Sequence, residues 1–233
     1  MNIIDIVLLA IMLLYVLNGF YRGFLPSIAN LGGFFLSWIS ALIFFPSLSG
    51  RLASSAQISS LKFYIEGAEK VGDYELARRA LSSFSQSELE SAISNASAKL
   101  PLPFETAVAN NIKSRAFEAE GLTTLGEYFD ASIYHVILNI IAFLIIFVVV
   151  RVVLTLLINS FTYAASLPEL RHFDRTLGGA VSLARAFMSM YVVFALIPIA
   201  LILVPVTFVT DIVNSSFMST IFYDGSILLR FLA

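Results

Sequence analysis

Four long apolar stretches set the main constraint on how this chain can fold. They cover approximately residues 3–20, 24–45, 133–158 and 177–206. Each comes close to, or exceeds, the roughly 20 apolar residues that an α-helix needs to cross the hydrocarbon layer of a bilayer. A backbone surrounded by lipid must satisfy its hydrogen bonds internally, which helices achieve. The sequence therefore predicts an all-α, polytopic membrane bundle with about four transmembrane helices.

The composition supports a membrane protein and argues against several other classes. The chain is 58% hydrophobic and 13% charged, whereas a soluble domain is roughly half apolar and roughly a quarter charged. A net charge of −2 gives no basic field to attract nucleic acid, so no such partner is expected. The chain has no cysteine, which excludes disulfides and thiolate chemistry. Its start lacks a basic n-region, so we expect the first stretch to be retained as a span.

The apolar stretches divide the chain into four predicted segments. Residues 1–46 and 133–206 are expected to form two transmembrane hairpins, the first turning at Tyr21-Arg22-Gly23 and closed by Pro46. Residues 47–132 carry most of the charge and many Ser and Ala, which favours an extramembrane helical segment. That segment is either a small cap over the bundle or a partner-binding domain. Residues 207–233 contain interrupting polar residues and favour an interfacial or re-entrant helix over a fifth span.

Local signals place helix boundaries inside the polar segment. Ser85 to Glu88 and Thr124 to Glu127 both fit a capping box, in which two side chains satisfy amides of the first helical turn. The sequence Pro101-Leu102-Pro103 is expected to separate two amphipathic helices.

Basic residues near the spans predict the orientation. Arg22 lies in the first connection, and Arg171 and Arg175 lie in the third. Because short cytoplasmic loops are rich in Lys and Arg, both connections are expected to face the cytoplasm. The N-terminus and residues 47–132 then lie on the opposite side of the membrane.

Small residues recur every four positions on two of the predicted spans. The second span carries Ala29, Gly33, Ser37 and Ala41, and the fourth carries Gly178, Ser182 and Ala186. Positions i and i+4 share a helix face, and small residues there allow a second helix to approach closely. Each stripe is either a packing seam within the chain or a contact between subunits of a homo-oligomer.

Two arginines lie inside the last two spans, where charge is costly. Arg151 and Arg185 are either anchors that reach toward the cytoplasmic surface or members of a shared polar crevice. Glu169 and Asp174 are the candidate counter-ions. Asp174 is also expected to cap the fourth helix. Pro198 is expected to kink the same span.

Nothing in the sequence supplies a catalytic constellation. His135 and His172 are the only histidines, and no phosphate-binding loop or zinc-type histidine pair is present. Although His172 precedes Asp174 by two residues, no nucleophile accompanies them. We therefore expect a protein that is not an enzyme and that needs no cofactor or metal.

Two motifs resemble the bacterial colicin V production protein (CvpA) family. One runs from Asn2-Ile3-Ile4-Asp5 to Asn18-Gly19-Phe20-Tyr21-Arg22-Gly23-Phe24, and the other is Phe173-Asp174-Arg175-Thr176-Leu177-Gly178-Gly179, followed by Arg185. The resemblance covers roughly residues 1–45 and 135–200. The family often has Arg-Gly where this chain has Arg185-Ala186. The positions that match the family's motifs are Asp5, Arg22, Gly23, Asp174, Arg175, Gly178, Gly179 and Arg185.

The resemblance implies a multi-pass protein of the bacterial inner membrane, and the orientation expected from the basic residues then places the N-terminus and residues 47–132 in the periplasm. It implies a role in the production or export of a peptide toxin and in envelope maintenance, with no enzymatic activity. Such a protein would have the lipid bilayer and a membrane or periplasmic protein as partners. The alternative is a homo-oligomeric channel or transporter with an arginine-lined path.

Overall fold

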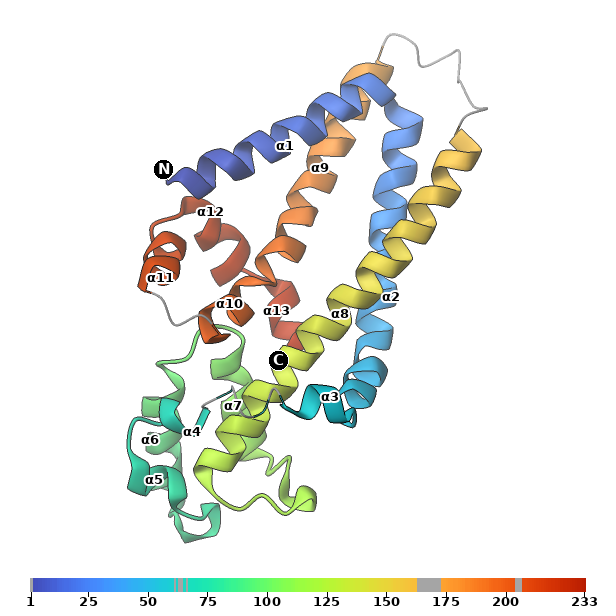
Figure 1. Ribbon diagram of the computed structural model, residues 1–233. Coiled ribbons are helices and arrows are strands. Elements are labelled where there is room, and N and C mark those ends of the chain that lie inside the picture. Colours follow the sequence, from blue (N-terminus) through green and yellow to red (C-terminus); the bar gives the residue numbers. More distant parts are fainter. Residues whose placement is uncertain (1, 61, 63–64, 66, 163–172, 204–206) are drawn as a thin grey trace. The chain divides into compact units, whose positions relative to one another are not determined.

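The computed structural model describes residues 2–60, 62, 65, 67–162, 173–203 and 207–233 (Figure 1). Across these residues the ordered elements are helices, and four of them are long and apolar enough to cross a membrane. They are α1 (Ile3–Arg22), α2 (Phe24–Ala53), α8 (Leu125–Thr162) and the stretch Asp174–Leu203, which comprises α9 (Asp174–Phe194) and α10 (Ile197–Leu203). The predicted all-α class and the four spans are confirmed.

The chain forms two compact units, each of which is described by itself. The first unit contains Met1–Pro46, Ala142–Phe194 and Thr210–Gly225. The second contains Ser47–Ile141, Ala195–Val209 and Ser226–Ala233. Helices α2 and α8 contribute to both units because each is long enough to continue beyond the boundary.

In the first unit, α1 and α9 pack against each other through glycines (Figure 1). A Cβ atom on Gly178 would lie 2.5 Å from the carbonyl oxygen of Gly19, and one on Gly19 would meet both Gly178 and Ser182. Gly179 faces the ring of Phe20, where a Cβ would lie 2.7 Å from a ring carbon. Backbone atoms cannot move aside as side-chain tips can, so this crossing requires glycine.

A second seam in this unit joins α2 to the end of α8. A Cβ on Gly33 would lie 2.8 Å from Cδ1 of Ile158 and 3.1 Å from a guanidinium nitrogen of Arg151. The rings of Phe34 and Phe147 meet edge to face, with centroids 5.2 Å apart. The hydroxyl of Ser37 donates a hydrogen bond to the backbone carbonyl of Gly33 in its own helix at 2.7 Å. Both small-residue stripes therefore contact helices of the same chain.

The stripes differ in how deeply their members are buried. Gly33, Ser37 and Ala41 are buried on α2, as are Gly178, Ser182 and Ala186 on α9, while Ala29 is half-buried. Ala29 thus lies at the margin of the seam.

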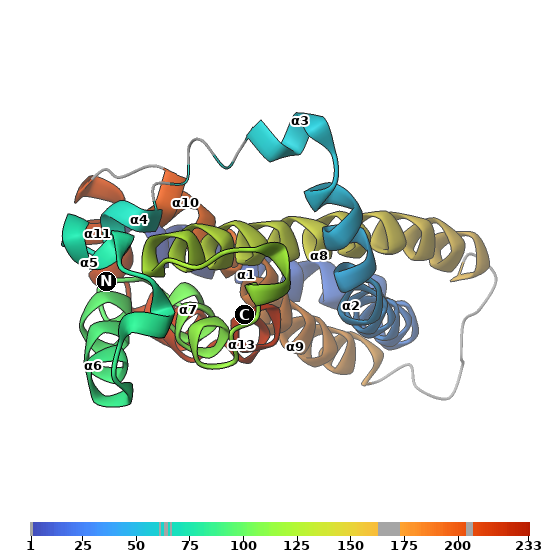
Figure 2. The same ribbon diagram turned by 90° about the horizontal axis from the view of Figure 1, so that it is seen from below.

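The second unit gathers short helices around the first turns of α8. They are α3 (Ala56–Ser59), α4 (Gly67–Lys70), α5 (Tyr74–Arg78), α6 (Gln86–Ser97) and α7 (Phe104–Lys113), with 3-10 turns at Leu81–Ser83 and Glu118–Glu120. Helices α6 and α7 pack against each other (Figure 2). Phe104 and Val108 of α7 and Phe129 of α8 are fully buried. The break predicted at Pro101-Leu102-Pro103 lies between α6 and α7, as expected.

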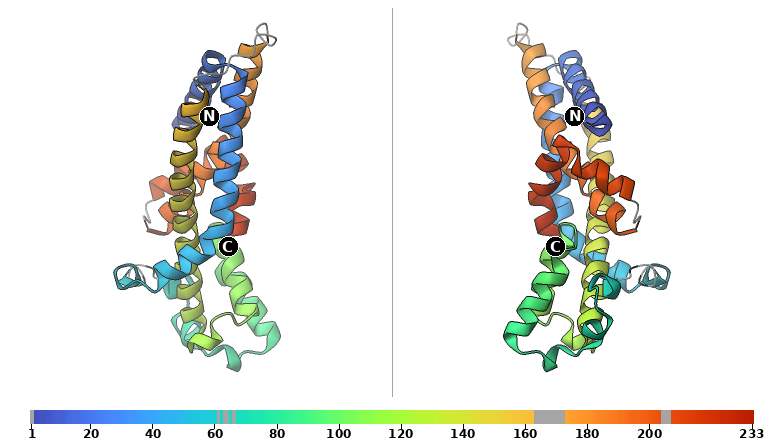
Figure 3. Two further views of the ribbon diagram at one scale, coloured as in Figure 1. Left: turned by 90° about the vertical axis from the view of Figure 1, so that its right-hand side faces the viewer. Right: turned by 90° about the vertical axis from the view of Figure 1, so that its left-hand side faces the viewer.

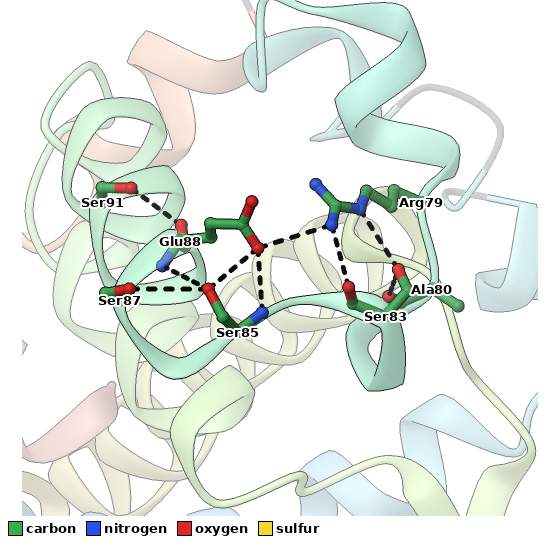
Figure 4. Close-up of polar contacts among 7 residues, drawn as sticks. All are labelled: Arg79, Ala80, Ser83, Ser85, Ser87, Glu88 and Ser91. Atoms are coloured by element: carbon green, nitrogen blue, oxygen red, sulfur yellow. Dashed lines mark hydrogen bonds and ion pairs between the residues drawn. The ribbon is translucent and has the colours of Figure 1, made fainter.

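The start of α6 is the predicted capping box (Figure 4). Ser85 donates its backbone N–H and its hydroxyl to Glu88, both at 2.9 Å, while Arg79 approaches the same carboxylate at 3.5 Å. These two hydrogen bonds and the guanidinium charge hold the pKa of Glu88 below its usual value. Arg79 also donates to the carbonyl of Ser83 at 2.8 Å, which ties the preceding turn to the box.

The second predicted box explains why α8 begins before the apolar stretch. Glu127 accepts the N–H groups of Thr123 and Thr124, each at 2.8 Å, and Thr124 Oγ1 accepts the Glu127 N–H at 3.4 Å. The helix consequently begins at Leu125, eight residues before the predicted span.

One boundary prediction was wrong, whereas the disturbance expected at Pro198 is present as a break in the helix. Pro46 does not close the second span, because α2 continues through it to Ala53; membrane-type helices tolerate a lost backbone bond of this kind. The fourth apolar stretch is interrupted between Phe194 and Ile197, and the buried Pro198 is the second residue of α10. Proline suits the first turn of a helix, where its missing N–H has no helical partner.

The tail is also more divided than a single interfacial helix. It forms α11 (Thr207–Asn214), α12 (Phe217–Ser219), a π-helical turn (Thr220–Asp224) and α13 (Ile227–Leu232). Figure 3 shows these short elements from two sides. None of them reaches the length of a membrane span.

The glycine crossing gives a direct test of the α1–α9 seam. We expect Gly178→Ala to lower the free energy of unfolding by about 1–3 kcal/mol, because the new methyl group overpacks against backbone atoms. Gly32→Ala is the matched control, since a Cβ there would meet no atom within 4 Å. Unfolding in detergent, followed by circular dichroism against denaturant, measures both. Equal stability of the two variants would contradict the close packing of α1 against α9 at Gly178.

Candidate functional site

The first unit has an open cavity of about 550 Å³ that is lined by α1, α2, α8 and α9. Its polar lining includes residues from all four helices: Asn18, Arg22, Asn30, Arg151, Thr155 and Arg185. Three guanidinium groups thus lie at one cavity, although their positions in the sequence are far apart. Sequence reasoning had paired Arg151 with Arg185 and had placed Arg22 only in the connecting turn.

Arg151 is held inside the bundle by α2. It donates to the backbone carbonyl of Asn30 at 3.1 Å and to the side-chain oxygen of the same residue at 3.3 Å. Asn30 is itself oriented, because its amide donates to the carbonyl of Pro26 at 2.8 Å. The guanidinium therefore has a fixed position next to the cavity.

Arg185 is held by an aromatic ring of α1. Its guanidinium carbon lies 4.9 Å from the centroid of the Tyr15 ring, a cation–π distance. Its Nε is buried and has no hydrogen-bond partner in the structure. Arg22 and Arg151 line the same cavity as Arg185, so the cavity gathers like charges. One donor at the centre of the cationic cluster is thus unsatisfied.

Of the two expected counter-ions, the one that the structure describes, Asp174, does not line the cavity. No carboxylate lines the cavity among the described residues, and the only ion pairs recorded there, Arg79–Glu88 and Arg115–Glu118, lie in the second unit. Glu169 lies outside the described residues, as does His172. The carboxylate of Asp174 accepts a hydrogen bond from a backbone amide of α2.

Asp174 caps a helix other than its own. It is the first residue of α9, and its Oδ1 accepts the backbone N–H of Phe24, the first residue of α2, at 2.9 Å. The turn between α1 and α2 is Gly23, with φ of +84°, and a Cβ there would collide with the Asp174 carboxylate. Asp174 does lie in the first turn of α9, as predicted, whereas its contact with α2 was not foreseen because the amide belongs to a distant part of the sequence.

Asp5 makes a similar contact at the other end of α1. This buried carboxylate accepts the hydroxyl of Ser216 at 2.7 Å and the backbone N–H groups of Met218 and Phe217 at 3.0 and 3.3 Å. It also accepts the N–H of Asn2 at 2.8 Å, as part of the capping box of α1. Asp5 therefore joins the start of α1 to the start of α12, and it is not part of the cavity.

The remaining predicted positions are structural or peripheral in the described chain. Gly178, Gly179 and Ser182 lie at the α1–α9 crossing. Arg175 is exposed, and Pro198 is buried in the second unit. Three residues that sequence reasoning missed are Tyr15, Gly19 and Asn30. Gly19 was visible in the first family motif, whereas Tyr15 and Asn30 follow no spacing rule.

A smaller cavity of about 490 Å³ lies in the second unit beside α4, α5 and α8. Three acidic residues of its lining, Asp73, Glu127 and Asp130, serve as helix caps. Asp130 accepts the backbone N–H of Ala68 at 2.9 Å, and Glu127 caps α8. No cluster of potential metal ligands occurs among the residues that the structure describes. The arginine cavity therefore remains the stronger candidate site.

The Asp174 contact predicts a stability defect. Asp174→Ala removes the acceptor of the Phe24 amide and should cost about 1–2 kcal/mol, the upper range for a lost helix cap. Asp174→Asn retains an acceptor oxygen and should cost less. Asp224→Asn, at an exposed position of the same unit, is the control. Unfolding midpoints in detergent measure all three, and an Asp174→Ala midpoint equal to that of the control would contradict the cap.

Comparison with known proteins agrees with these motifs. The profile of a family described as colicin V production protein matches residues 4–71 and 114–226. The unmatched stretch in the middle of the chain, residues 72–113, contains α5, α6 and α7. No curated protein and no solved structure gave a match. Because the profile covers most of the chain, including both predicted hairpins and most of the tail, this membrane protein belongs to the colicin V production protein family.

Proposed function

We propose that this protein is a non-enzymatic component of the bacterial inner membrane that supports peptide-toxin production or export and envelope maintenance. The observation that carries the proposal is the family match across all four apolar helices. The family's printed description refers to colicin V production, and the four helices provide the membrane location in which an accessory role would be exercised.

The contacts of the acidic motif residues support a structural role over a catalytic one. Asp5 and Asp174 accept backbone amides at helix starts, which leaves them occupied as caps. The cavity offers three cationic groups, but none of its described lining residues is a carboxylate or a histidine that could act as a general base. Binding and positioning are therefore the chemistry that this site favours.

A gene deletion in the bacterial host tests the proposed role. In a host that makes colicin V, loss of the gene should lower the amount of active toxin in the medium and increase sensitivity to detergents. The wild-type gene and the Gly32→Ala variant should restore both properties, since Gly32 has open space around it. Normal secretion together with a normal envelope in the deletion strain would overturn the proposal.

The proposed orientation places residues 47–132 in the periplasm and the Arg22 turn in the cytoplasm. The chain has no cysteine, so single cysteines can be introduced into an otherwise unreactive background. In intact cells with a permeable outer membrane, Ser94→Cys on α6 should react with a membrane-impermeant maleimide. Tyr21→Cys, at a position that is 91% exposed, should react only after the inner membrane is opened. The reverse pattern would invert the topology.

A second candidate function is a homo-oligomeric channel or transporter for anions. The observation that favours it is the convergence of Arg22, Arg151 and Arg185 on one cavity. Rings or clusters of arginine attract anions in selective pores. Four helices alone enclose little space, so this function would require several subunits.

A further inference from the structure

The arginine cavity has a polar end and an apolar end. The guanidinium group of Arg151 contacts Asn30, and that of Arg185 contacts Tyr15. Asn30 and Tyr15 lie seven and eight residues from Gly23, about 11 Å along a helix. The polar end is therefore close to the turn where Gly23 and Asp174 join the helices.

The apolar lining lies farther from that turn. Ile11 is twelve residues before Gly23 on α1, while Val192 and Val193 are more than four helical turns from Asp174 on α9. The Phe34 and Phe147 rings pack together on the α2–α8 side. A ligand that fits this lining has a charged head and a hydrocarbon portion.

The positive charge at the polar end of the cavity requires a ligand whose head is negatively charged. Three guanidinium groups line the cavity, with Arg151 and Arg185 half-buried and Arg22 exposed, and no carboxylate is among the described lining residues, so these like charges repel one another. Taking cations out of water costs several kcal/mol each unless an opposite charge compensates. An anion in the cavity would relieve this repulsion, and it would give the unsatisfied Nε–H of Arg185 an acceptor.

We propose that this cavity binds one anionic phospholipid, with the phosphate among Arg22, Arg151 and Arg185 and an acyl chain along the apolar end. The three guanidinium groups come from three different helices, and guanidinium groups bind phosphate oxygens through strong, charge-assisted hydrogen bonds. A volume of about 550 Å³ accommodates a headgroup and part of a chain. This binding goes beyond both candidate functions, because it requires neither toxin export nor ion flow.

Native mass spectrometry of the full-length protein tests the proposal. Detergent-solubilised protein is titrated with phosphatidylglycerol or with phosphatidylcholine of the same acyl chains. We expect one phosphatidylglycerol to be retained at least tenfold more tightly than phosphatidylcholine. Equal retention of the two lipids by the wild-type protein would overturn the proposal without any variant.

Substitutions locate the bound lipid. Arg151→Gln and Arg185→Gln should each reduce the preference for phosphatidylglycerol at least fivefold, while Arg185→Lys should keep part of it because the charge remains. Arg51→Gln removes an exposed arginine of the second unit and should leave the preference unchanged. Unfolding midpoints show which variants are folded, and a folded Arg185→Gln variant with the wild-type preference would contradict this site.

Competition distinguishes a lipid from a free anion. Inorganic phosphate and water-soluble glycerol phosphate lack the acyl chain, so neither should displace the lipid at tenfold molar excess. Displacement by either compound at equimolar concentration would identify a free-phosphate site and overturn the lipid assignment. Loss of toxin secretion is a separate measurement, so failure of lipid binding and failure of the proposed export role are distinguishable.

Discussion

Backbone amides at helix starts need acceptors, and in this protein carboxylates from distant segments supply them. Asp174 accepts the first amide of α2, and Asp5 accepts amides at the start of α12. In the second unit, Asp130 does the same for α4. A buried amide that is left without an acceptor costs about 1–3 kcal/mol. A local requirement of each helix thereby becomes a connection between segments that are 62 to 213 residues apart.

Caps and glycine contacts depend on each other at the α1–α2 turn. Gly23 adopts a positive φ and leaves room for the Asp174 carboxylate, while Gly19 lets α9 approach the end of α1. If α9 were held farther away by side chains, Asp174 could not reach the Phe24 amide. The matching motif residues around Gly23 and Gly178 thus form one structural unit, which explains why they form no recognisable catalytic set.

Hydrophobicity was sufficient to predict the four spans, and capping chemistry was sufficient to predict the starts of α6 and α8. Asp174 shows the limit of such reasoning: its sequence context indicates the start of α9, whereas the amide that it binds belongs to a helix 150 residues away. The expectation that Pro46 closes the second span failed for a related reason. The rule that proline ends a helix does not account for long membrane-type helices, which tolerate an internal proline. The sequence suggested a polar crevice shared by the two arginines of the last spans, but its full lining could not be derived, since Tyr15 and Asn30 reveal their roles only when four helices converge.

The arginine cavity brings together two interpretations that the sequence had left apart. Arg151 and Arg185 do lie within apolar helices, but their guanidinium groups contact Asn30 and Tyr15 inside the bundle. If Arg151 and Arg185 only anchored the helices at lipid headgroups, they would need neither these contacts nor a third arginine at the same cavity. A polar crevice without a counter-ion would carry the full cost of like-charge repulsion. An anionic ligand removes that cost, so lipid binding and bundle stability would be linked: a ligand that binds only the folded state stabilises it.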